Sequence, residues 1–107
     1  MFHHIVLIKY KRGHDPHIHR RMKKFCRDVA KELPGAVSCY YGENAAQKYS
    51  APHASKGHVQ GFTHILVTVF KSVRAHENYQ QAALHDEMRP HLRKEMKEFV
   101  ICDYHSR

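Results

Sequence analysis

The sequence contains no tryptophan, only five glycines and four prolines, and no long apolar run. Its three cysteines, Cys26, Cys39 and Cys102, lie far apart and form no C-x-x-C pair, so neither a disulfide framework nor a cysteine-based zinc site is expected. A cytoplasmic location, where thiols stay reduced, is the natural interpretation. No stretch approaches the roughly 18 apolar residues of a membrane-spanning helix. The first apolar run stops at Lys9 without a small-residue cleavage site, so no signal peptide is expected either.

Acidic residues are scarce: 10 Asp and Glu stand against 18 Lys and Arg, giving a net charge of +8 with histidine neutral. Such an excess can indicate a nucleic-acid partner, small acidic ligands, or solubility alone. The basic residues Arg20, Lys24, Arg27 and Lys31 recur on one face of a predicted helix without interleaved aromatic residues for base stacking. We therefore expect a solvated face rather than a nucleic-acid interface, and an anion-binding protein stays as one alternative.

The chain of 107 residues has room for one domain, and its 42% hydrophobic and 26% charged residues are typical of a globular protein. Alternation and capping signals predict an α+β domain in the order β-α-β-β-α-β, the ferredoxin-like arrangement with an antiparallel sheet. We predict strands at 2–11, 36–42, 62–71 and 99–104, helices at 16–33, 73–81 and 90–97, and a long polar loop at 43–60. A loop of this length is often functional.

Both faces of the predicted strands carry apolar residues. His4 and Val6 share one face of the first strand, and His64 and Leu66 share the equivalent face of the third, so these side chains can line one cavity together. Helices cover one face of a ferredoxin-like sheet, and the apolar opposite face needs a cover as well. The economical cover is a second copy of the chain, so we predict a homodimer that packs sheet against sheet.

Several short segments, in the same order and spacing, resemble the stress-responsive dimeric α+β barrel (Dabb) family. They are His4-Ile5-Val6-Leu7, Leu33-Pro34-Gly35, Gly61-Phe62-Thr63-His64, Phe70-Lys71-Ser72 and Asp103-Tyr104. The resemblance covers essentially the whole chain. It implies two ferredoxin-like halves that pair into a barrel, with a pocket in each half.

The resemblance also implies a chemistry, because polyketide cyclases of this family use a tyrosine and a histidine for a proton-abstracting aldol cyclisation. These residues fall on Tyr79 and His85, and the reaction needs no organic cofactor. The remaining pocket positions that we expect to bind a small-molecule substrate are His4, His64, Val6, Leu66, Met22 and Cys26.

One departure from the family pattern concerns the turn before His85. The family often has His-Pro-x-His, whereas this chain has Ala82-Ala83-Leu84-His85. On a continuous helix Tyr79 and His85 lie about 120° apart, so they converge only if the helix breaks between them. With a break, we expect an enzyme that acts on a small carbonyl or aromatic compound. Without it, a non-catalytic stress-responsive or ligand-binding dimer is the alternative.

The remaining histidines give weaker indications of function. His14, His17 and His19 have the composition of a metal cluster, but they stand at an exposed helix start without partner ligands, so we predict no metal site. A histidine could serve as an axial ligand of haem, yet nothing in the sequence specifies haem. We expect surface positions for His53, His58, His76, His91 and His105.

Overall fold

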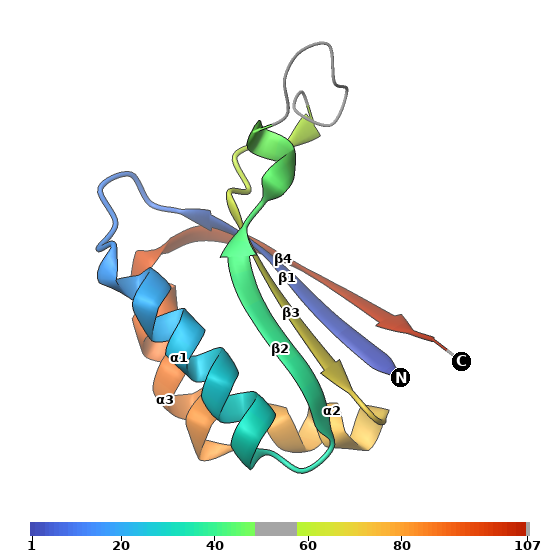
Figure 1. Ribbon diagram of the computed structural model, residues 1–107. Coiled ribbons are helices and arrows are strands. Elements are labelled where there is room, and N and C mark those ends of the chain that lie inside the picture. Colours follow the sequence, from blue (N-terminus) through green and yellow to red (C-terminus); the bar gives the residue numbers. More distant parts are fainter. Residues whose placement is uncertain (49–57, 107) are drawn as a thin grey trace.

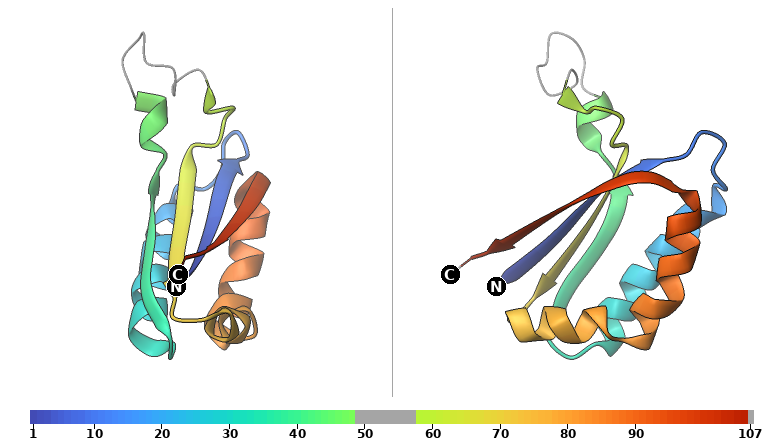
Figure 2. Two further views of the ribbon diagram at one scale, coloured as in Figure 1. Left: turned by 90° about the vertical axis from the view of Figure 1, so that its right-hand side faces the viewer. Right: turned by 180° about the vertical axis from the view of Figure 1, so that it is seen from behind.

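The computed structural model describes residues 1–48 and 58–106 and shows one antiparallel sheet with helices packed on one side (Figures 1 and 2). The elements are β1 (Phe2–Tyr10), α1 (His17–Glu32), β2 (Ala36–Glu43), the 3-10 helix η1 (Ala45–Lys48), β3 (His64–Phe70), α2 (Val73–Gln80), α3 (Ala83–Glu95) and β4 (Met96–His105). The strand order β2-β3-β1-β4, with every neighbouring pair antiparallel, confirms the ferredoxin-like α+β fold.

The helix predicted at 90–97 is longer in the structure. Helix α3 begins at Ala83 rather than near Pro90, and it follows α2 almost directly. The strand β4 follows directly at Met96 instead of residue 99. Part of the predicted loop at 43–60 forms η1, and its residues 49–57 lie outside the described residues.

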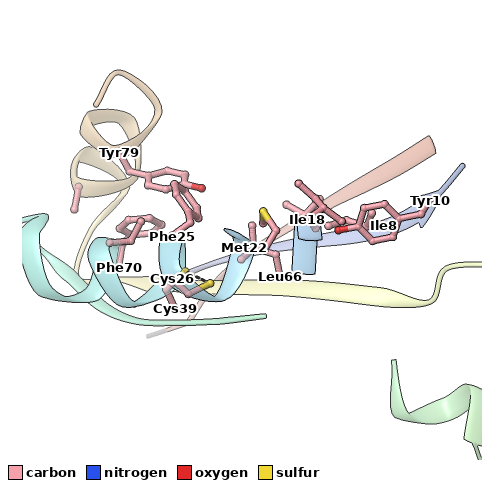
Figure 3. Close-up of a cluster of buried hydrophobic side chains, with 13 residues drawn as sticks. Ile8, Tyr10, Ile18, Met22, Phe25, Cys26, Cys39, Leu66, Phe70 and Tyr79 are labelled. Carbon is pink, nitrogen blue, oxygen red and sulfur yellow. Dashed lines mark hydrogen bonds between the residues drawn. The ribbon is translucent and has the colours of Figure 1, made fainter. Parts of the chain in front are cut away.

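The core fills the space between the helices and one sheet face. Alternate residues of β1 and β3 point into it, with Ile8 and Phe70 fully buried, and Met22 and Val29 of α1 pack against them. Figure 3 shows this cluster, in which apolar side chains of α1, the sheet and α2 meet. The residues that alternation groups on one face of these strands are therefore the ones that the helices cover.

Two local features place α2 over the start of β1. The hydroxyl of Ser72 accepts a hydrogen bond from the N–H of Ala75 at 3.2 Å, which caps the first turn of α2. Gly35 has a φ of +84°, and a Cβ there would lie 2.7 Å from the Cβ of Ala75. The turn after α1 thus needs glycine so that α2 can approach it closely.

The opposite sheet face carries no helix (Figure 2). Cross-strand pairing places Ile5 opposite Cys102 and Leu7 opposite Val100 on this face. Val100 is 38% exposed and Tyr104 is 62% exposed, although both are large apolar or aromatic side chains on one sheet face. This face therefore presents apolar surface that the single chain does not bury.

Candidate active site

A cavity of about 210 Å³ lies between α3 and the helix-covered face of the sheet. Five of the residues predicted from the sequence line it: His4, Val6, Leu66, Tyr79 and His85. The sheet supplies the first three, and the end of α2 and the start of α3 supply the other two.

The chain breaks between α2 and α3 without the proline that the family often has there. Ala82 adopts an extended backbone, with φ −74° and ψ 148°, and its N–H donates to the carbonyl of Tyr79 at 3.1 Å. This turn redirects the chain, so Tyr79 and His85 face each other edge to face with ring centroids 4.9 Å apart. The geometric condition for a shared site is met.

His85 and Tyr79 both carry a neutral side chain near pH 7. Burial lowers the pKa of His85, and the positive charge of Arg89 lowers it further. Its Nδ1 is buried and has no hydrogen-bond partner among residues 1–48 and 58–106. Burial raises the pKa of Tyr79, which is 2% exposed. A neutral imidazole that can accept a proton thus lies beside a phenol that can donate a hydrogen bond.

His4 is held by a carboxylate on the neighbouring strand. Its Nδ1 lies 2.7 Å from Oδ1 of Asp103, the residue directly opposite in the β1–β4 pairing. Because a carboxylate only accepts, Nδ1 of His4 carries the hydrogen of this bond. Asp103 therefore fixes the orientation of a histidine that lines the cavity.

His76 lies in the same region, and the expectation that it is a surface residue was wrong. It is 6% exposed, and its ring lies 4.5 Å from the ring of His4. The rings of Phe2 and Phe70 pack on it at 4.6 Å and 5.4 Å, because α2 crosses the sheet at that point. Helix α2 has only eight residues, so its sequence gave no clear signal of which helix face would be covered.

His64 is not brought to the cavity. It pairs with Ile8 whereas His4 pairs with Thr68, so the two histidines stand four residues apart along β1, about 13 Å. Both do lie on one face of the sheet, as their alternation predicted, and this is the face that the helices cover. The expectation that they share one cavity was wrong, because alternation defines the face of a strand but not the position along it.

His64 instead belongs to what we call the histidine–tyrosine network: Tyr10, His14, His19, Tyr41 and His64. The hydroxyls of Tyr10 and Tyr41 lie 2.6 Å apart, Nδ1 of His19 lies 2.7 Å from the Tyr41 hydroxyl, and Nε2 of His19 lies 3.0 Å from Nε2 of His14. The His64 ring stacks on His19 at 4.3 Å. Burial lowers the pKa of His64 to about 4.

Of the three histidines around the start of α1, the structure pairs two. His17 turns away and lies 2.9 Å from the carboxylate of Asp15. His14 and His19 contact each other within the histidine–tyrosine network. The three do not converge as a common set of ligands.

Met22 and Cys26 of α1 are core residues rather than part of the cavity wall. Met22 is fully buried, and Sγ of Cys26 lies 3.0 Å from Sγ of Cys39 on β2. The residue of α1 that lines the cavity is Phe25, whose ring lies 6.2 Å from that of Tyr79 (Figure 3). The cavity residue of this helix thus lies one position from Cys26 and three positions from Met22.

Comparison with known proteins places this geometry in context. No helix in the described part of the chain is long and apolar enough to cross a membrane. No curated protein matches the sequence. Among solved structures, a protein from Arabidopsis thaliana is 20% identical with a TM-score of 0.76, and the match covers 100% of this chain and 96% of that one.

Two further solved structures have the same fold. Hydroxynitrile lyase from Passiflora edulis is 17% identical with a TM-score of 0.74, over 96% of this chain and 88% of that chain. A dimeric protein of unknown function with a ferredoxin-like fold, from Bacteroides fragilis, is 14% identical with a TM-score of 0.73, over 98% and 95%. The family described as the stress responsive A/B barrel domain (Dabb) matches residues 2–106, so this chain belongs to the Dabb family.

Proposed function

We propose that the protein is a small dimeric enzyme that removes a proton next to the carbonyl group of a small compound. The observation that carries the proposal is the meeting of Tyr79 and His85, 4.9 Å apart between ring centroids, on the wall of one cavity. A base and a hydrogen-bond donor at this spacing can act on the carbon and the oxygen of one enolisable group.

The reaction can be followed atom by atom. A nitrogen of the neutral His85 takes a proton from the carbon next to the carbonyl. The electron pair of that C–H bond forms a C=C bond, and the π electrons of the carbonyl move onto its oxygen. The hydroxyl of Tyr79 donates a hydrogen bond to this enolate oxygen. When the enolate carbon attacks a second carbonyl of the substrate, the new alkoxide takes the proton back from His85. This aldol step needs no organic cofactor.

The cavity wall also suggests which compounds fit. A volume of about 210 Å³ is below the range of about 300–1,000 Å³ for drug-sized ligands, which favours a small substrate. Arg89 and Arg93 line the same cavity, so an acidic group on the substrate would find a cationic partner. A short polyketide-like or keto-acid compound satisfies both conditions. The name of the Passiflora edulis relative adds cleavage of hydroxynitriles as a second reaction to assay.

We also propose that the working unit is a homodimer joined through the bare sheet face. Three of the solved relatives are described as dimeric ferredoxin-like proteins. The apolar residues of that face, including Val100 at 38% exposure, would be buried by a second sheet. Sedimentation velocity tests this: we expect a dimer for the wild type and a monomer for Val100→Lys. A monomeric wild type at micromolar concentration contradicts the proposal.

A cytoplasmic location is part of the same proposal. It is supported by the two buried thiols of Cys26 and Cys39, which stand 3.0 Å apart as free cysteines and would be kept reduced there.

Exchange of substrate protons with deuterium tests the chemistry directly, because it detects proton removal before any product forms. With β-diketones and linear poly-β-ketones in D₂O, we expect His85→Gln to slow exchange about 100-fold or more. His91→Gln, an exposed histidine on the same helix, is the matched control and should exchange like the wild type. If His85→Gln also exchanges and turns over like the wild type, the enzyme proposal fails and a ligand-binding dimer takes its place.

A further inference from the structure

One cluster of polar groups, two buried histidines and an exposed carboxylate, has no part in the proposed reaction. His4, His76 and Asp103 come from β1, α2 and β4, and one ring nitrogen of each histidine and one carboxylate oxygen lie within 4.8 Å of one another. Among the described residues this is the one group of three or more potential metal ligands with such spacing. The sequence showed no metal site because these residues are 27 to 99 positions apart.

His76 has a buried ring nitrogen without a hydrogen-bond partner among the residues that the structure describes. Its Nε2 is buried and has no hydrogen-bond partner within residues 1–48 and 58–106, and the side chain is 6% exposed. A buried nitrogen without a hydrogen-bond partner reduces the stability of the fold, so such groups are rare without a role. A neutral imidazole with a free nitrogen is the form that binds metal ions.

We propose that His4, His76 and Asp103 bind a divalent transition metal ion, with Zn²⁺ as the best fit. Two imidazoles and one carboxylate form the donor set of zinc sites that keep an open fourth position. The ligand atoms of a tetrahedral zinc site stand ~3.3 Å apart, so atoms that lie within 4.8 Å of one another here need to approach by at most ~1.5 Å.

The surroundings of this His4–His76–Asp103 site suit an ion. The rings of Phe2 and Phe70 pack against His76 and exclude water from one side. The Asp103 side chain is 37% exposed, which gives the ion a path from solvent. Nδ1 of His4 lies 2.7 Å from Oδ1 of Asp103, so these two ligands are adjacent before the ion arrives, and an ion bound through Nδ1 displaces the hydrogen of that bond. His4 also lines the cavity, so the site adjoins it.

Zn²⁺ binding to the untagged protein, measured by competition with a chromogenic chelator, tests the proposal without any enzyme assay. We expect one equivalent of Zn²⁺ per chain and an affinity at least about tenfold weaker in two variants. Asp103→Asn keeps the shape of the side chain but removes its charge. His76→Phe replaces one aromatic ring by another among Phe2 and Phe70, so the protein should fold and its metal-free unfolding midpoint should not fall.

Two controls locate the ion. Glu98→Gln removes an acidic group from the same strand and should bind Zn²⁺ like the wild type, since Glu98 pairs with Lys9. His14→Ala disrupts the contact between His14 and His19 and should also leave binding unchanged. The proposal is overturned if the wild type binds no Zn²⁺, or if binding persists in Asp103→Asn and His76→Phe. These outcomes are independent of proton exchange at His85, so this proposal and the proposed function fail separately.

Discussion

The helix-covered face of the sheet has a cluster of histidines and tyrosines at each end, and the two clusters are built differently. The histidine–tyrosine network joins Tyr10, Tyr41 and His19 by hydrogen bonds of 2.6 Å and 2.7 Å. At the other end, Tyr79 and His85 lie beside a cavity, and Nδ1 of His85 has no hydrogen-bond partner in the described part of the chain. Residue types are nearly the same, so composition alone does not distinguish the two.

The difference between the two clusters distinguishes buried polar groups that stabilise the fold from buried polar groups that are free to bind or react. Buried polar atoms that bond one another are satisfied and stabilise the fold, whereas those left without a partner reduce stability and are retained where they bind or react. We therefore assign a structural role to the histidine–tyrosine network and a chemical role to the cavity residues. Substitutions of equivalent residues at the two ends should have opposite effects on activity and stability.

The largest effect is expected from Tyr79→Phe. Loss of the hydroxyl removes the donor to the enolate oxygen, and loss of such a donor typically slows a reaction about 100- to 1,000-fold. No described residue bonds this hydroxyl, so the unfolding midpoint should stay close to that of the wild type. Proton-exchange rates measure the loss of activity, and thermal unfolding of the same sample measures the midpoint. An inactive variant that is also strongly destabilised would point to a packing role instead.

Tyr41→Phe should show the reverse pattern. Its hydroxyl contacts both the Tyr10 hydroxyl and Nδ1 of His19, so its removal leaves two groups without that partner. We expect a loss of about 2 kcal/mol in the free energy of unfolding and unchanged proton exchange. Urea denaturation measures it, with Tyr40→Phe as the control because Tyr40 is 72% exposed. Equal stability of the two variants would mean that the network contributes little to folding.

The sequence predicted these clusters unevenly, for physical reasons. Alternation correctly placed His4 and His64 on the same face of the sheet, because strand periodicity is a local property. It could not predict that they lie about 13 Å apart, because the register between β1 and β3 depends on contacts distant in sequence. The burial of His76 was missed for the same reason: Phe2 and Phe70, which cover it, lie on two other elements.

The pairing of Tyr79 with His85 shows a different limit. The resemblance to the family supplied both residues, but spacing left open whether the helix breaks between them. The outcome depended on the backbone of Ala82, which is extended although no proline follows it. Residue type restricts such a turn only weakly, so the sequence could state the condition without deciding it.

The pH dependence of stability offers a smaller effect in the histidine–tyrosine network. The folded-state pKa of His64 is about 4, against about 6.5 in the unfolded chain, because burial and then the nearby His19 and His14 disfavour its charge, while Glu43 acts in the opposite direction. The unfolded chain therefore binds the proton first as the pH falls. The stability that the neutral His64 contributes to the folded state is fully present above pH 6.5 and is lost between pH 6.5 and 4.

We expect His64 to account for about 1 kcal/mol of the stability lost over that interval, less than the full shift implies because the ring is partly exposed. Urea denaturation at pH 7 and pH 4.5 measures the loss, and His64→Gln should reduce it by that amount. Parallel pH profiles for the wild type and the variant would show that His64 is not the group responsible.

The smallest effect tests the turn that brings Tyr79 to His85. Ala83 is the first residue of α3, where the N–H has no partner within a helix and proline is favoured. Ala82 has the extended backbone that a residue before proline prefers. Ala83→Pro should therefore stabilise the protein by about 0.5 kcal/mol, by restricting the unfolded chain, and leave proton exchange intact. If urea denaturation shows a less stable variant, or if proton exchange is lost, the turn in solution differs from an extended Ala82. The approach of Tyr79 to His85 then loses its structural basis.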